Sequence, residues 1–155
     1  MAVSERWFDD FSVGEVFETG SYRMVEERMI AFAAEFDPQV FHTDPLAAAD
    51  TIYGGLIASG WHTGSVLMKL LAGLLGPSSL GSPGCDKLRW IAPVRPGDEL
   101  TLRVTVLDTR PSKTKPDRGV VVLFNEVLNQ SGQVVMSLES SMLLRRHADR
   151  IGPGP

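Results

Sequence analysis

An aspartate and a histidine, Asp37 and His42, lie five residues apart in a stretch that begins with Pro38 and ends at Pro45. The prolines disfavour one regular helix, so a tight turn could bring the two side chains across one small cavity. Imidazole exchanges protons near neutral pH, and a carboxylate beside it orients the ring or binds a water molecule. The pair indicates acid–base chemistry, although most Asp–His pairs in loops are structural.

A glycine-containing segment, from Tyr53 to Gly60, leads into the longest apolar stretch of the chain. The first turn of a helix leaves backbone N–H groups unpaired and partially positive, and glycine lets a ligand approach them closely. We interpret the segment as an oxyanion site, suited to a thioester carbonyl that gains charge when water attacks a conjugated double bond. In the alternative interpretation Ser59 is only a helix N-cap and Gly60 only a turn residue, and both interpretations can hold at once.

Other reactive residues give weaker indications. His62, in the first turn of the same helix, is expected to be packed and bonded to a nearby carbonyl, with a substrate or supporting contact as the less favoured alternative. His147 lies in a polar terminal segment and is expected to be solvated. The single cysteine, Cys85, has no partner for an internal disulfide and is expected to be a small core or strand residue.

Composition sets the class of protein. The chain has 155 residues, of which 43% are hydrophobic and 22% charged, as in an ordinary globular domain. The formal charge of −4 argues against a surface for duplex nucleic acid. The single cysteine and the lack of a long apolar span favour a cytoplasmic protein without a membrane partner. We expect one domain over residues 1–146 and a flexible tail over 147–155.

Hydrophobic periodicity predicts two helices. Residues 25–36 have the pattern of an amphipathic helix, whereas residues 61–75 are apolar almost all round, which is typical of a buried helix. Residues 38–59 are expected to be mostly irregular, apart from a short helical turn over 46–49 that Asp44 caps.

The second half of the chain has the signals of strands and hairpins. Segments rich in Val, Leu and Thr alternate with turn residues, and one further strand is expected through Val16 and Phe17. The pattern predicts an α+β fold in which an antiparallel sheet wraps around a long central helix. The four later strands are expected over residues 87–91, 99–109, 119–128 and 133–144.

These residues together resemble the MaoC-like dehydratases, also called R-specific enoyl-CoA hydratases. The resemblance spans about Phe8 to Arg145 and is strongest from Asp37 to Gly60, where spacing and order both agree. It rests on Phe32-Ala33, Asp37-x-x-x-x-His42-x-Asp44, Ala48, Tyr53-Gly54, Ile57-Ala58-Ser59-Gly60, Trp90 and Pro93-Val94-Arg95-Pro96-Gly97-Asp98-Glu99-Leu100.

The resemblance implies a hot-dog fold and a homodimer, or a dimer of dimers, with active sites at the subunit interface. It implies that Asp37 and His42 activate a water molecule and that the Gly60 N–H polarises the thioester of an acyl-CoA-type substrate. No metal or organic cofactor is expected, since coenzyme A is part of the substrate, and a metal site at Asp37, His42 and Asp44 lacks a standard zinc spacing. Substrate contacts are expected at Gln39, Phe41, Tyr53, Gly55, Ile57, Ala58, Ser59 and Trp61.

The chain departs from the family pattern at several positions. Phe36 replaces a glycine, Gln39-Val40 replaces Asn-Pro, Ser59 replaces a histidine, and Met68 stands where some members have a serine. Two alternatives therefore stay open: a hot-dog thioesterase, and a non-catalytic protein that binds acyl thioesters. Candidates for contacts with the nucleotide of coenzyme A, each more often an ordinary surface charge, are Lys87, Arg89, Arg95, Lys113 and Lys115.

Overall fold

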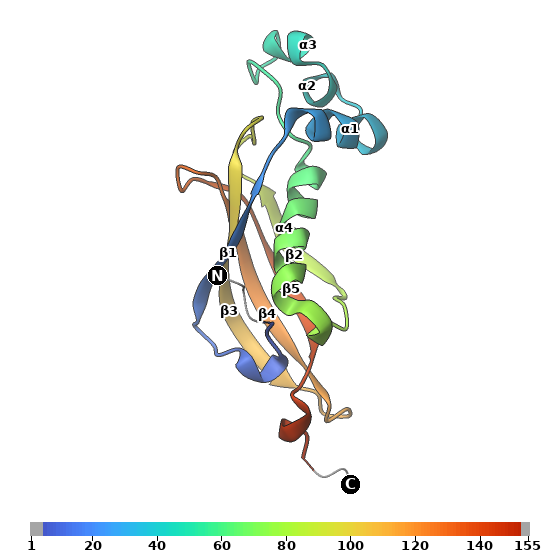
Figure 1. Cartoon of the computed structure of the whole chain (residues 1–155), viewed down its shortest axis with the longest axis vertical. Helices are drawn as coiled ribbons and strands as arrows, with labels where there is room; N and C mark the ends of the chain where they lie inside the picture. The colour runs from blue at the N-terminus through green and yellow to red at the C-terminus, as the bar shows by residue number, and fades with distance from the viewer. Residues whose placement is uncertain (1–4, 153–155) are drawn as a thin grey trace.

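One antiparallel sheet and one long helix dominate the structure (Figure 1). The computed structural model describes residues 5–152. Its strands are β1 (Val16–Arg23), β2 (Gly84–Trp90), β3 (Glu99–Pro111), β4 (Arg118–Leu128) and β5 (Val134–Arg145). Within the described residues these five strands form one sheet in the order β1-β3-β4-β5-β2, and every neighbouring pair is antiparallel.

The central strands show the alternation that the sequence predicts. In β3 the side chains of Leu100, Leu102 and Val104 are fully buried, while the residues between them are only half-buried. Successive side chains of a strand point to opposite faces, so one face of the sheet is apolar and packs on α4 (Gly60–Leu75). The predicted α+β architecture is confirmed: the sheet curves around one long helix, as in the hot-dog fold.

The prediction that α4 is buried on all sides was wrong. Leu67 and Leu71 are buried against the sheet, but Trp61 is 58% exposed and Met68 is 46% exposed on the other side of the helix. A sheet covers only one side of a helix, so the remaining apolar side faces outward in the single chain. No helix in residues 5–152 is long and apolar enough to cross a membrane.

Three short helices stand beyond the end of the sheet where α4 begins: α1 (Glu26–Phe36), α2 (Val40–Thr43) and α3 (Pro45–Ala49) (Figure 1). The Asp44 carboxylate accepts from the backbone N–H groups of Leu46 and Ala47, which confirms the predicted cap of α3. Helix α2 was not predicted, because a single turn of four residues is too short to show a helical period.

The opposite end of the molecule holds a cluster of ion pairs. Asp9 pairs with Arg146, and the His147 ring lies 2.9 Å from a carboxylate oxygen of Asp10 and packs on Trp7. The His147 side chain is 35% exposed, so it is partly solvated as expected, but its contacts with Asp10 and Trp7 were not predicted. Sequence periodicity carries no information about a contact between residues 137 positions apart.

Candidate active site

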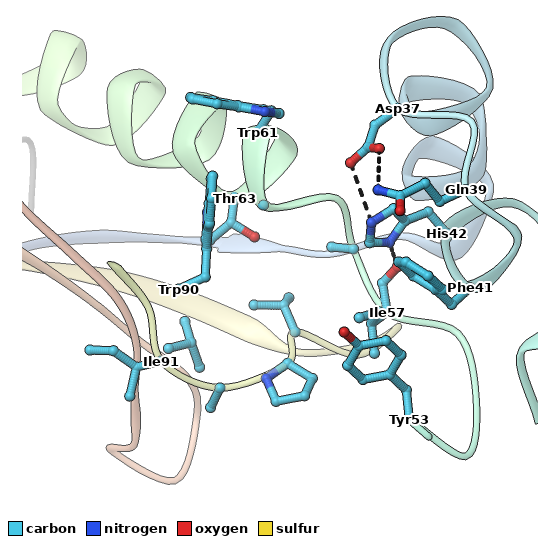
Figure 2. A pocket seen from close by; sticks show the side chains of 16 residues that line it. Asp37, Gln39, Phe41, His42, Tyr53, Ile57, Trp61, Thr63, Trp90 and Ile91 are labelled. Atoms are coloured by element: carbon cyan, nitrogen blue, oxygen red, sulfur yellow. Dashed lines mark hydrogen bonds and ion pairs between the residues drawn. The ribbon is translucent and has the colours of Figure 1, made fainter. Parts of the chain in front are cut away.

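Asp37 is placed by the end of α1. Its backbone N–H still bonds to the Ala33 carbonyl, but its own backbone is not helical, because Pro38 disfavours the helical conformation of the residue before it. Gln39 is the N-cap of α2, which starts at Val40, so the chain reverses within a few residues. The reversal brings the Asp37 carboxylate back over α2, where it meets the ring of His42 (Figure 2).

The hydrogen bond of His42 to the Ile57 carbonyl determines its tautomer. His42 Nδ1 lies 2.8 Å from that carbonyl oxygen, and a carbonyl only accepts, so Nδ1 carries the proton. In the neutral ring the lone pair is then on Nε2, which lies 3.3 Å from Asp37 Oδ2 (Figure 2). Two hydrogen-bond acceptors, His42 Nε2 and Asp37 Oδ2, therefore face each other. Either a proton on the ring or a water molecule that donates to both atoms satisfies this arrangement.

The Asp37 carboxylate is held in its ionised form. Ser59 Oγ donates to Oδ2 over 2.7 Å, and Gln39 Nε2 donates to Oδ1 over 2.7 Å. Burial raises the pKa of Asp37, but the bonds from Gln39 and Ser59 and the nearby His42 outweigh it, so the pKa lies below its usual value. At neutral pH the site thus contains a carboxylate able to accept a proton.

A Gln39→Leu variant is expected to raise the pKa of Asp37, because it removes a hydrogen bond that is stronger to the ionised form than to the protonated one. Since Asp37 is more acidic folded than unfolded, the stability it contributes is present above its unfolded pKa and is lost as the pH falls through the lower folded pKa. Carbon-13 NMR of the Asp37 carboxyl group measures the shift directly, and a Gln130→Leu variant, remote in sequence, is the control. An unchanged Asp37 titration in Gln39→Leu contradicts the assigned cause.

The start of α4 provides a hydrogen-bond donor facing the same space. Ser59 caps the helix: its hydroxyl accepts from the Trp61 N–H, and its carbonyl accepts from His62 and Thr63. Among the described residues, the N–H of Gly60 has no acceptor. An unpaired amide at a helix N-terminus carries partial positive charge and favours a developing oxyanion.

Gly60 also lies directly beneath an aromatic ring. A Cβ added at this residue would lie 2.3 Å from Cε2 of Trp90, which is impossible without movement. The Trp90 ring also meets the ring of Trp61 edge to face, with centroids 5.1 Å apart. Only glycine at position 60 lets the Trp90 indole lie against the start of the helix.

These groups surround a cavity of about 540 Å³. Most residues predicted from the sequence line it, with Gly55 and Ser59 as the exceptions. Ser59 does not line the cavity, but its hydroxyl donates a hydrogen bond to the Asp37 carboxylate, which does. Gly55 lies next to the guanidinium of Arg95. The predicted residues in the wall are Asp37, Gln39, Phe41, His42, Tyr53, Ile57, Ala58, Gly60 and Trp61.

Part of the wall was not predicted. One missed residue, Thr63, lies three positions after Gly60, and helical spacing alone could have placed it on the same face. The others belong to β5, to the end of β2 or to the segment that follows β2. Part of this region carries the family resemblance, so that resemblance was the available signal. These other residues are Trp90, Ile91, Ala92, Pro93, Val94 and Val135.

His62 points away from this cavity. Its ring stacks on Phe32, with centroids 4.7 Å apart, and burial lowers the pKa of His62. The prediction of a packed histidine is confirmed, but the predicted bond to a carbonyl is not seen: Nδ1 has no partner among the described residues. Cys85 was predicted to be a small core residue or a strand residue. It lies on β2, which confirms the second prediction, and it is exposed rather than in the core.

The structure offers few contacts for a metal ion or for the phosphate groups of a ligand. Over residues 5–152, no three His, Cys, Asp or Glu side chains are grouped so as to hold a metal ion. Lys87 pairs with Glu139, whereas Arg95 donates to the carbonyl of Tyr53, a residue of the cavity wall. Arg95 is thus the predicted phosphate candidate that the structure places beside the cavity.

Comparison with known proteins agrees with this geometry. The model of the MaoC-like domain family matches residues 10–126, which include the whole Asp37–Gly60 segment. The chain belongs to the MaoC-like family. The uncharacterized protein YdeM of Bacillus subtilis (strain 168) is 34% identical over 140 residues, which cover 89% of this chain and 98% of that protein.

Solved structures extend the likeness to the fold of the MaoC-like family. The MaoC-like dehydratase from Rhodospirillum rubrum is 41% identical with a TM-score of 0.82, and the match covers 92% of this chain and 98% of that one. The R-hydratase PhaJ1 from Pseudomonas aeruginosa is 26% identical with a TM-score of 0.70, over 96% and 95% of the two chains. The family and the hot-dog fold predicted from the sequence are thereby confirmed.

Proposed function

We propose that this MaoC-like protein adds water to trans-2-enoyl thioesters and catalyses the reverse dehydration of 3-hydroxyacyl thioesters. The observation that carries the proposal is the meeting of the Asp37 carboxylate and Nε2 of His42, in the same cavity as the Gly60 N–H, which has no acceptor among the described residues. A base for water and a donor for a thioester oxygen are the two groups that this addition requires.

In the proposed reaction, each of these groups takes part in one step. A water bound between Asp37 and His42 loses one proton to the pair as its oxygen forms a bond to C3 of the substrate. The electrons of the double bond move toward the thioester, and the negative charge on its oxygen is stabilised by the Gly60 amide at the start of α4. The pair then returns the proton to C2, so the atoms and charges balance and no cofactor takes part.

The apolar surfaces fit an acyl substrate. Trp61 lines the catalytic cavity and also a second, largely apolar hollow of about 380 Å³ between α4 and strands β2 and β5. An acyl chain that leaves the catalytic cavity past Trp61 would be surrounded by Met68, Leu71 and Leu138. We propose coenzyme A, or another phosphopantetheine carrier, as the thiol, with Arg95 beside the wall residue Tyr53 as a contact for its phosphates.

The exposed apolar face of α4 supports a homodimer. Trp61 and Met68 are large apolar side chains on one helix face, and such surfaces mark contacts with other molecules more often than with water. We propose a second copy of the chain as the partner. Light scattering should then give a mass of about twice the 16.9 kDa of one chain.

The test is an assay with trans-2-butenoyl-CoA and its longer homologues. Addition of the protein is expected to lower the absorbance of the conjugated thioester to an equilibrium level without releasing free thiol. Thiol release with a chromogenic reagent would instead identify a thioesterase, in which Asp37 directs water to the carbonyl itself. Tight binding without either change would identify a non-catalytic protein, and both outcomes contradict hydration.

A further inference from the structure

The hydroxyl of Thr63 is an unused polar group in the wall of the catalytic cavity. Thr63 lines the cavity and is only 2% exposed. A buried threonine in a helix usually bonds to the carbonyl four residues back, but here the Ser59 carbonyl accepts backbone N–H groups only. Across the described residues, the Thr63 hydroxyl has no hydrogen-bond partner, and in Figure 2 its oxygen projects into the space between Trp90 and the Asp37–His42 pair.

The position of Thr63 on α4 brings its hydroxyl toward Gly60. Residues three apart lie on the same helix face, and Cα–Cβ bonds tilt toward the helix N-terminus. The Thr63 side chain therefore reaches back over the first turn, where the free N–H of Gly60 is located. Two donors with no protein acceptor thus face one part of the cavity.

We propose that Thr63 is a catalytic residue that donates its hydroxyl to the thioester oxygen of the substrate, as the second donor beside the Gly60 N–H. The inference rests on the proposed hydration. The Thr63 hydroxyl is open to the cavity, so a carbonyl oxygen that gains negative charge in the transition state accepts from it most strongly at that moment. No proton is transferred from Thr63: it only donates a hydrogen bond.

Several other polar groups of the cavity already have partners. Gln39 and Ser59 are already bonded to Asp37, and His42 uses Nδ1 on the Ile57 carbonyl. The Asp37–His42 pair must face C3 and its water, whereas the thioester carbonyl is two bonds further along the substrate. The Tyr53 hydroxyl and the indole N–H groups of Trp61 and Trp90 also line the cavity. Thr63 differs from them because it lies three residues after Gly60 on the same face of α4, beside the backbone donor that is proposed for the carbonyl oxygen.

The experiment compares Thr63→Val, which keeps the shape and removes the hydroxyl, with Thr63→Ser, which keeps the hydroxyl. For trans-2-butenoyl-CoA, kcat of Thr63→Val is expected to fall roughly 100-fold, the lower range for loss of one oxyanion donor, with a much smaller change in KM. Thr63→Ser should recover most of the rate. Thr105→Val, on the face of β3 turned away from α4, is the matched control and should keep wild-type kinetics.

A second readout does not depend on turnover. The infrared carbonyl band of bound butanoyl-CoA, labelled with carbon-13 at the carbonyl, should lie at lower frequency than in free thioester. That displacement should shrink in Thr63→Val and return in Thr63→Ser. Thermal unfolding should be unchanged in Thr63→Val, because the hydroxyl makes no bond in the fold.

The outcomes separate this inference from the proposed function. An active wild type with an equally active Thr63→Val variant overturns the role of Thr63 and leaves hydration intact. In another outcome, the wild type hydrates no enoyl-CoA and still shows the carbonyl displacement, which Thr63→Val then loses. That result supports the Thr63 contact and contradicts the proposed hydration. A bound thioester whose carbonyl band is the same in wild type and Thr63→Val overturns the inference in either case.

Discussion

An Asp37→Asn variant is expected to hydrate trans-2-butenoyl-CoA about 10³-fold more slowly than the wild type, a typical loss for removal of a general base. The amide cannot take a proton from water, although it matches the carboxylate in shape. Ser59 and Gln39 both donate to Asp37, so an amide oxygen can still satisfy one of them. The effect should therefore appear in kcat, as measured from the enoyl absorbance under saturating substrate.

The partner variant, His42→Ala, tests whether the two groups act as a unit. Each single change removes one side of the site that holds the water, since His42 Nε2 and Asp37 Oδ2 are 3.3 Å apart. Groups that act together give non-additive losses, so the double variant should be little slower than either single variant. Independent losses that multiply, or an Asp37→Asn variant with an intact rate, would contradict the proposed mechanism.

The second large effect is expected for Gly60→Ala. The added methyl group would lie 2.3 Å from Trp90 Cε2 and 2.4 Å from its Nε1, and the rigid indole cannot yield by bending. Trp90 must therefore move, and because it lines the catalytic cavity, its movement changes the shape of the cavity wall. We expect kcat/KM to fall by about 10²-fold, as for a displaced oxyanion donor, and the free energy of unfolding to fall by about 1–3 kcal/mol from overpacking.

The helix provides its own control. Gly73 is also in α4, but a Cβ there would meet nothing within 4 Å, so Gly73→Ala should keep full activity. It should also stabilise the helix by about 0.5–1 kcal/mol. Trp90→Ala in the Gly60→Ala background should restore the melting temperature lost through the clash. A fully active Gly60→Ala variant would show that activity does not depend on the observed position of the Trp90 indole.

The sequence predicted those features that depend on local pattern. The alternation from Leu100 to Val106 follows from the two-residue period of a strand, and the cap at Asp44 follows from the chemistry of the residue before a helix-starting proline. The one-turn helix α2 and the outward side of α4 carry no such signal. The first is too short, and the second depends on how much of the helix the sheet covers.

The candidate site divides in the same way. Spacing placed Asp37 and His42 on either side of a turn, but it could not show that Ser59 donates to Asp37 from 22 residues away. Trp90 illustrates the same limit, because its contact with Gly60 joins two segments 30 positions apart in the chain. Thr63 was within reach of a local argument, since it follows Gly60 by less than one helical turn.

The edge-to-face pair of Trp61 and Trp90 gives this protein a built-in optical reporter. The chain has three tryptophans, and two of them form the cavity wall, while Trp7 packs on His147 at the far end of the molecule. Two of the three indoles that contribute to the intrinsic fluorescence therefore lie where the proposed acyl substrate would bind. Occupancy of the site can be followed by emission in unlabelled protein, including in variants that no longer turn over substrate.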